Sequence, residues 1–130
     1  MPPAYTLSSR IEDGLLLLDI EGTFASADVT ALVEEIYHLA ATLRPTAMLV
    51  DQTRFRGRPG LGTVYFASRM HPSPMPSIPV AVVEDARHQA LAEFHETTVQ
   101  NSGINLRSFF VRAEAIAWLR GAAQARGDSA

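Results

Sequence analysis

The sequence contains no cysteine, no long apolar run and no excess of basic residues. Without thiols there are no disulfides, no thiol catalysis and no zinc–thiolate site. No apolar run approaches the roughly 18–20 residues that cross a bilayer, so we expect no transmembrane segment. The net charge of −3 argues against nucleic acid as a partner, because phosphate neutralisation requires a basic face. The N-terminus also lacks the regions of a signal peptide, and these features together predict a cytoplasmic protein.

The length of 130 residues is typical of one domain and allows a sizeable hydrophobic core. We predict a single domain over residues 1–126 and a disordered tail at 127–130.

Apolar runs and helical stripes alternate along the chain. Strands are predicted at 5–11, 15–20, 47–50, 80–83 and 106–111, and helices at 29–43, 61–70, 86–101 and 113–123. The order β-β-α-β-α-β-α-β-α indicates the α/β class, a single mixed sheet of about five strands with about four helices. Its first two strands form an antiparallel hairpin around the turn Glu12-Asp13-Gly14, and the other strands are largely parallel.

The stretch after Asp51 is the main candidate for binding. It is predicted to be a loop beyond a strand end, where ligands of open α/β sheets usually bind. Arginines and glycines next to a helix N-terminus suit an anion or an acidic partner surface. The alternative is a solvated loop whose arginines pair with acidic residues of the chain. The candidate binding residues are Arg54, Arg56, Arg58, Gly60, Gly62 and Thr63, and Thr63 could contact such an anion or carry a phosphate itself.

An apolar candidate surface follows in the predicted helix at 61–70. Phe66 and Met70 are spaced i, i+4 on the side opposite Leu61 and Val64, and a one-sided surface helix needs no second apolar pair. They form either the rim of the core or a surface for a partner or ligand. In a ligand-binding protein, Tyr65, Phe66, Met70 and Met75 would line an apolar pocket.

No catalytic, metal or cofactor site is predicted. The glycines at 57, 60 and 62 match neither a dinucleotide fingerprint nor a P-loop, and there is no His-Glu-x-x-His motif. His88 and His95 lie two helical turns apart, too far to chelate one metal ion. Asp51 could orient a catalytic group, with an arginine and His71, but acids at strand ends more often fix the adjoining loop, and no nucleophile–base pair can be named.

Several stretches resemble the anti-sigma-factor-antagonist-like (STAS) superfamily. They are Pro79-Val-Ala-Val-Val-Glu-Asp, Ala92-Glu-Phe-His-Glu-Thr, Asn101-Ser-Gly-Ile-Asn-Leu-Arg-Ser-Phe and Glu114-Ala-Ile-Ala-Trp-Leu. The resemblance runs from Gly14 to Leu119 and is closest to a bacterial branch that borders on the CRAL-TRIO lipid-binding fold. It implies the element order predicted above and a non-catalytic domain that binds a protein or a small ligand.

One family motif is altered in this chain. STAS domains carry Ser-Ser-Gly-Leu-Gly, in which a serine is phosphorylated to control partner binding. Gly60-Leu61-Gly62 resembles the end of that motif, but Arg58 and Pro59 occupy the serine positions and Gly57 the position of the motif's aspartate. The resemblance therefore implies a constitutive binding surface more readily than a phosphorylation switch.

Three functions follow from these features. We predict first a regulatory interaction module that binds a protein partner through residues 54–70. The alternative is a carrier or sensor of a small apolar or anionic ligand such as a lipid, with the arginines at its head group. An enzyme is the third and least favoured. A homodimer could form through the opening edge strand or the Phe66 face.

Overall fold

The computed structural model describes residues 4–57, 78–100 and 105–129. Its elements are β1 (Tyr5–Glu12), β2 (Leu15–Thr23), a 3-10 turn at Ser26–Asp28, α1 (Val29–Leu43), β3 (Ala47–Arg56), β4 (Val80–Val83), a 3-10 turn at Ala86–His88, α3 (Gln89–Gln100), β5 (Leu106–Phe109) and α4 (Arg112–Ser129). The predicted helix at 61–70 lies outside the described residues. The last helix is longer than predicted.

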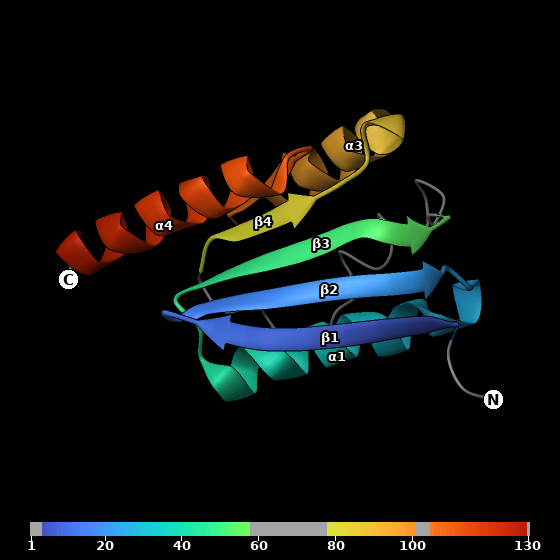
Figure 1. The fold of residues 1–130 in the computed structure, drawn as a ribbon, viewed down its shortest axis with the longest axis horizontal. Coiled ribbons are helices and arrows are strands. Elements are labelled where there is room, and N and C mark those ends of the chain that lie inside the picture. Colours follow the sequence, from blue (N-terminus) through green and yellow to red (C-terminus); the bar gives the residue numbers. More distant parts are fainter. Residues whose placement is uncertain (1–3, 58–77, 101–104, 130) are drawn as a thin grey trace.

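The strands form one five-stranded sheet in the order β1-β2-β3-β4-β5 (Figure 1). β1 and β2 are antiparallel, and every later neighbouring pair is parallel. The predicted α/β class and strand directions are therefore confirmed. Asp13 and Gly14 both have positive φ, at 52° and 84°, which is the backbone of the tight two-residue hairpin turn that joins β1 to β2.

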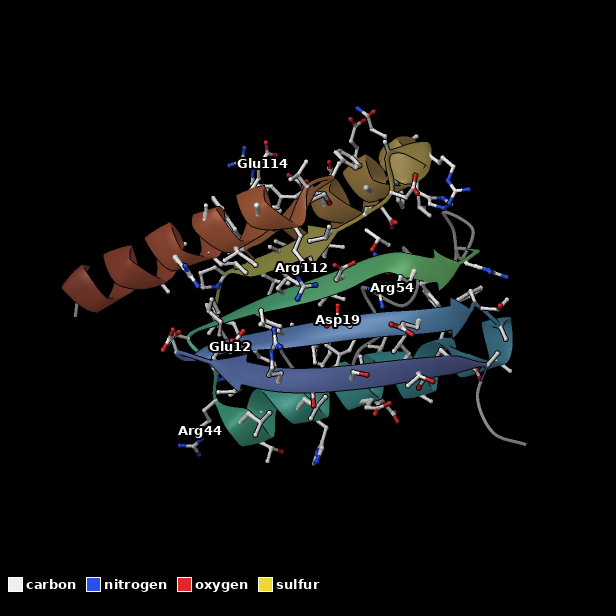
Figure 2. All side chains as sticks on the ribbon, viewed as in Figure 1. Glu12, Asp19, Arg44, Arg54, Arg112 and Glu114 are labelled. Carbon is white, nitrogen blue, oxygen red and sulfur yellow. The ribbon has the colours of Figure 1, made fainter. Side chains whose placement is uncertain are left out.

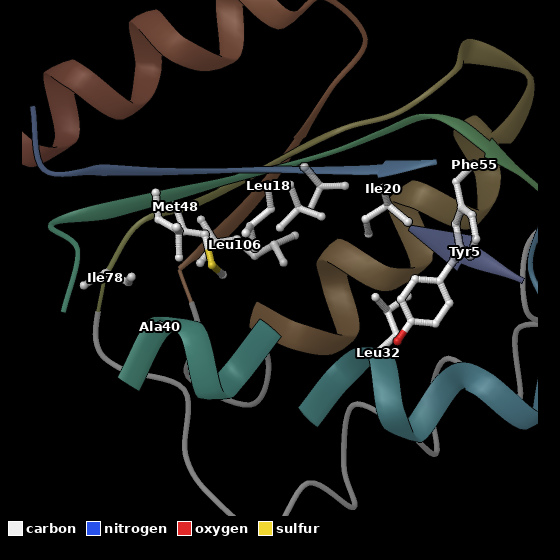
Figure 3. Close-up of a cluster of buried hydrophobic side chains, with 13 residues drawn as sticks. Tyr5, Leu18, Ile20, Leu32, Ala40, Met48, Phe55, Ile78 and Leu106 are labelled. Atoms are coloured by element: carbon white, nitrogen blue, oxygen red, sulfur yellow. The ribbon is translucent and has the colours of Figure 1, made fainter. Parts of the chain in front are cut away.

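Both faces of the sheet are covered, because successive side chains of a strand point to opposite faces. Figure 3 shows α1 and α3 on one side of the sheet and α4 on the other. In β2, Leu16 and Leu18 belong to the core on the α1 side, and Leu15 and Leu17 belong to the core on the α4 side. This explains the continuous apolar run of β2. From α4, Ala115 and Leu119 complete the second core.

β3 is longer than predicted. The predicted strand ended at Val50 and was followed by a loop, but β3 continues to Arg56 and stays paired with β2 up to Thr23. The two strands are not in uniform register, since Asp19 pairs with Asp51 whereas Glu21 pairs with Arg54. One extra residue in β3 is the mark of a β-bulge. Arg54 and Arg56 are therefore strand residues and not loop residues.

Asp28 marks the start of α1. It occupies the N-cap position and makes no side-chain capping hydrogen bond. Its carboxylate oxygen Oδ2 instead accepts a hydrogen bond from the backbone N–H of Ala4, at 3.1 Å. Asp28 thus ties the beginning of β1 to the beginning of α1.

We predict that Gly22→Ala strongly destabilises the fold. Gly22 has φ +114°, and an added Cβ would lie 2.4 Å from the carbonyl oxygen of Ala4, the residue before β1. The loss should be about 2–4 kcal/mol in the free energy of unfolding, measured by urea denaturation. Gly121 on α4 is the control, because a Cβ there meets nothing within 4 Å. Gly121→Ala should instead raise stability by about 0.5–1 kcal/mol, and equal effects of the two changes would contradict the structure.

Candidate functional site

The α4 face of the sheet changes from apolar to polar along β2 and β3. Near their amino ends these strands present Leu15, Leu17, Ala47 and Leu49 to the α4 core. Toward their carboxyl ends the same face carries charged side chains. We call this group the polar strip: Asp19, Glu21, Asp51, Arg54 and Arg56 of the sheet, with Arg112 at the start of α4.

The β-bulge determines which side chains of β3 join the polar strip. In an uninterrupted strand, Phe55 would share a face with Leu49 and Asp51, because all three are odd-numbered. Phe55 instead belongs to the core on the α1 side and is 6% exposed. Its ring contacts Phe24 edge to face, with centroids 6.1 Å apart. The extra residue thus buries Phe55 on one face and turns Arg54 and Arg56 to the other, together with Asp51.

Arg112 joins two carboxylates on neighbouring strands. Asp19 and Asp51 are paired residues in the parallel register of β2 and β3, so their negative charges lie side by side. The Nη1 atom of Arg112 donates to Asp19 Oδ1 at 2.9 Å and to Asp51 Oδ2 at 2.7 Å. Figure 2 shows Arg112 reaching from the start of α4 toward Asp19. One guanidinium therefore offsets the repulsion and fixes α4 to two strands.

Asp51 is the most enclosed member of this network, with an 11% exposed side chain. Burial by itself raises the pKa of its carboxyl. Hydrogen bonds from the backbone N–H and the hydroxyl of Thr53, and from Arg112, favour the ionised form more strongly, so the pKa is lowered overall. The Thr53 bonds measure 3.0 and 2.7 Å. Asp51 thus anchors the bulge and α4 as a carboxylate, in agreement with the predicted role of fixing the adjoining chain.

The two arginines of β3 have different surroundings. Arg54 Nη1 lies 2.6 Å from Glu21 Oε1 across the strand pair, and both side chains are largely exposed. This matches the alternative in which an arginine pairs with an acidic residue of the chain. Arg56 is exposed and has no side-chain ion pair with any other described residue. Its carbonyl oxygen accepts the N–H of Phe24 at 2.7 Å, which holds this end of β3 in place.

Most of the predicted binding residues lie outside the described part of the chain. Of the arginine and glycine candidates, the structure describes only Arg54 and Arg56, which it brings to the same face. Gly57 follows them with φ +77°, where the strand ends. The remaining candidates, Arg58, Gly60, Gly62 and Thr63, and the apolar candidates Tyr65, Phe66, Met70 and Met75, are outside the described residues and stay predictions.

Sequence reasoning missed Asp19 and Arg112 as members of the site. A signal for Asp19 was present, because it is the one charged residue within the apolar run at 15–20, just as Asp51 ends the run at 47–50. Two acids at matching positions of neighbouring buried strands require a cation between them. Nothing in the sequence indicated that Arg112, 61 residues from Asp51, supplies it.

The described part of the chain contains no cluster of three or more acidic or histidine side chains arranged to hold a metal ion. Its helices also include none that is long and apolar enough to cross a membrane.

Comparison with known proteins identifies the fold. No family model and no curated protein matches the sequence. Among solved structures, an anti-sigma factor antagonist from Mycobacterium paratuberculosis is similar, with a TM-score of 0.57 and 18% sequence identity over 92% of this chain and 97% of that chain. The predicted fold, that of an anti-sigma factor antagonist, is therefore confirmed. A STAS-domain antisigma-factor antagonist from Rhodobacter sphaeroides has a TM-score of 0.37 and 11% sequence identity over 86% of this chain and 91% of that chain. This TM-score is too low to support the assignment of the fold.

We predict that Arg112→Met lowers the free energy of unfolding by roughly 1–3 kcal/mol, because it leaves Asp19 and Asp51 facing each other without a cation. The loss is smaller than for a fully buried pair, since Arg112 and Asp19 are partly exposed. The matched control is Arg54→Met, which removes only a solvent-exposed pair with Glu21 and should change stability by less than about 0.5 kcal/mol. Chemical denaturation of both variants tests this. Equal losses would show that the Arg112 network has no special structural role.

Proposed function

We propose that this chain is a non-catalytic regulatory module that binds a protein partner through residues 54–70. The fold supports this, because the similar structure from Mycobacterium paratuberculosis is an anti-sigma factor antagonist. The observation that carries the proposal is the bulge in β3. It directs Arg54 and Arg56 to one open face at the carboxyl end of a parallel strand, the position where partners of open α/β sheets usually bind.

The charges at this end of β3 favour an acidic partner surface. Arg54 is already compensated by Glu21, whereas the exposed Arg56 forms no side-chain ion pair within the described residues. An exposed arginine on a backbone that is fixed in a sheet can form a bidentate pair with a partner carboxylate. In this proposal Arg56 makes the central polar contact, and Phe66 adds apolar area from the adjoining segment.

The environment of Asp51 supports a role without catalysis. Asp51 is the candidate acid for a catalytic role, and both of its carboxylate oxygens accept hydrogen bonds within the fold. A group held in this way, with a lowered pKa, is a poor general base near neutral pH. We therefore assign Asp51 to the framework of the module.

The test is a binding comparison with the wild-type chain as bait in extracts of its own source, followed by titration of each captured protein in purified form. The double variant Arg56→Glu with Phe66→Ala should weaken binding at least about tenfold, because it reverses the charge of Arg56 and removes the proposed apolar contact. Arg120→Glu is the control, since it makes the same charge change at an exposed position of α4. It should bind as the wild type does.

Retention of every partner by the double variant would contradict the proposal, as would an equal loss with Arg120→Glu. The alternative function, a carrier of a small apolar or anionic ligand, has a separate readout. Native mass spectrometry of the purified chain would then show a bound lipid, or a mass shift on adding one, and the Arg56→Glu variant would lose it.

A further inference from the structure

The first strand of the sheet has an open hydrogen-bonding edge. Among the described strands, β1 is an outer strand that pairs with β2 alone. The backbone N–H of Thr23 donates to the carbonyl of Ala4, so Ala4 and Thr23 are a hydrogen-bonded pair, and such pairs recur at every second residue of an antiparallel ladder. The backbone groups that face β2 therefore belong to Thr6, Ser8, Arg10 and Glu12, and those that point outward belong to Tyr5, Leu7, Ser9 and Ile11.

The opposite edge of the sheet is covered. On β5, the N–H of Ser108 donates to Glu96 Oε2 of α3 at 2.9 Å, and the Ser108 hydroxyl contacts the Ala92 carbonyl at 3.4 Å. No described residue hydrogen-bonds the outward backbone groups of β1 in this way. β1 lacks the proline and the bulge that commonly protect an edge strand, and its two charged side chains, Arg10 and Glu12, pair with each other.

We propose that β1 of a second copy of this chain pairs antiparallel with β1, about a two-fold axis at Ser8. Each outward-facing residue then finds an outward-facing partner in the other copy, Tyr5 with Ile11 and Leu7 with Ser9. The two sheets join into one continuous sheet. This proposal concerns assembly of the chain and does not depend on the proposed partner surface at residues 54–70.

The side chains of β1 favour this pairing. Ile11 is one of the exposed large apolar residues, at 44%, and in the joined sheet it lies opposite Tyr5 of the second copy on the apolar face. On the polar face, Arg10 lies opposite Thr6 and Ser8 opposite Ser8, so no like charges meet. An axis at Arg10 would instead place the two Arg10 side chains face to face.

The charge of β1 allows a second copy to approach this edge. Arg10 and Glu12 form an ion pair 3.1 Å apart within β1, so the strand carries no net charge that would repel its own copy. The same eight residues supply both sides of the interface, which is the self-complementarity that a two-fold dimer requires.

Sedimentation velocity over a range of protein concentrations tests this proposal. The wild-type chain should form a species of twice its 14.2 kDa mass. Ser9→Pro removes an outward-facing N–H while leaving the ladder with β2 intact, so it should be monomeric at every concentration. Ser9→Ala keeps that N–H and should dimerise as the wild type does.

A second variant tests the same interface without introducing a proline, which could itself disturb folding. Ser8→Lys changes only a side chain on the polar face and places two lysines against each other on the axis, so it should also be monomeric. Circular dichroism checks that each variant is folded. A wild-type chain that stays monomeric throughout, or a dimer that Ser8→Lys leaves intact, would overturn the proposal. Partner binding through Arg56 is measured separately and can persist in the monomeric variants.

Discussion

The bulge in β3 is the constraint on which the rest of the structure depends. A strand that pairs regularly keeps each side chain on one face, so Phe55 would be directed to the α4 side and the arginines to the α1 core. Burying two arginines without partners would cost several kcal/mol. The extra residue between Asp51 and Arg54 resolves this conflict, because the same strand supplies Met48, Val50 and Phe55 to the α1 core and its charges to the open face.

The polar strip has one end that stabilises the fold and another that is exposed to solvent. Arg112 forms ion pairs with both Asp19 and Asp51, which offsets their mutual repulsion and fixes the start of α4 over the sheet. Thr53, within the irregular part of β3, hydrogen-bonds Asp51, so the network also holds the bulge. Farther along, Arg54 is paired and Arg56 is exposed. The enclosed end of the strip thus stabilises the fold, and its open end presents charge to solvent beside the segment to which we assign partner binding.

Much of the fold could be predicted from local patterns. The apolar run at 15–20 indicated a strand, Glu12-Asp13-Gly14 indicated the hairpin, and the helical spacing of apolar residues at 29–43 indicated α1. The continuation of β3 could not be predicted from Gln52-Thr-Arg-Phe-Arg56. This stretch contains a single apolar residue, so it shows neither an alternation of apolar and polar residues nor a continuous apolar run. The ion-pair partner of Asp51 could not be predicted either, because only the packing of α4 brings Arg112 close to Asp51. Local propensity carries no information about contacts over such separations.

Backbone hydrogen exchange along β3, followed by NMR, tests the central claim most directly. Glu21 pairs with Arg54 and Thr23 with Arg56, and the Arg56 carbonyl accepts the N–H of Phe24. Because alternate residues of a parallel strand bond to the same neighbour, the amides of Arg54 and Arg56 should both face β2. We predict that both exchange at least about 100-fold more slowly than in an unstructured chain. Exchange of both amides at the unprotected rate would show that the chain leaves the sheet at Asp51, and would contradict this account of how the candidate site is built.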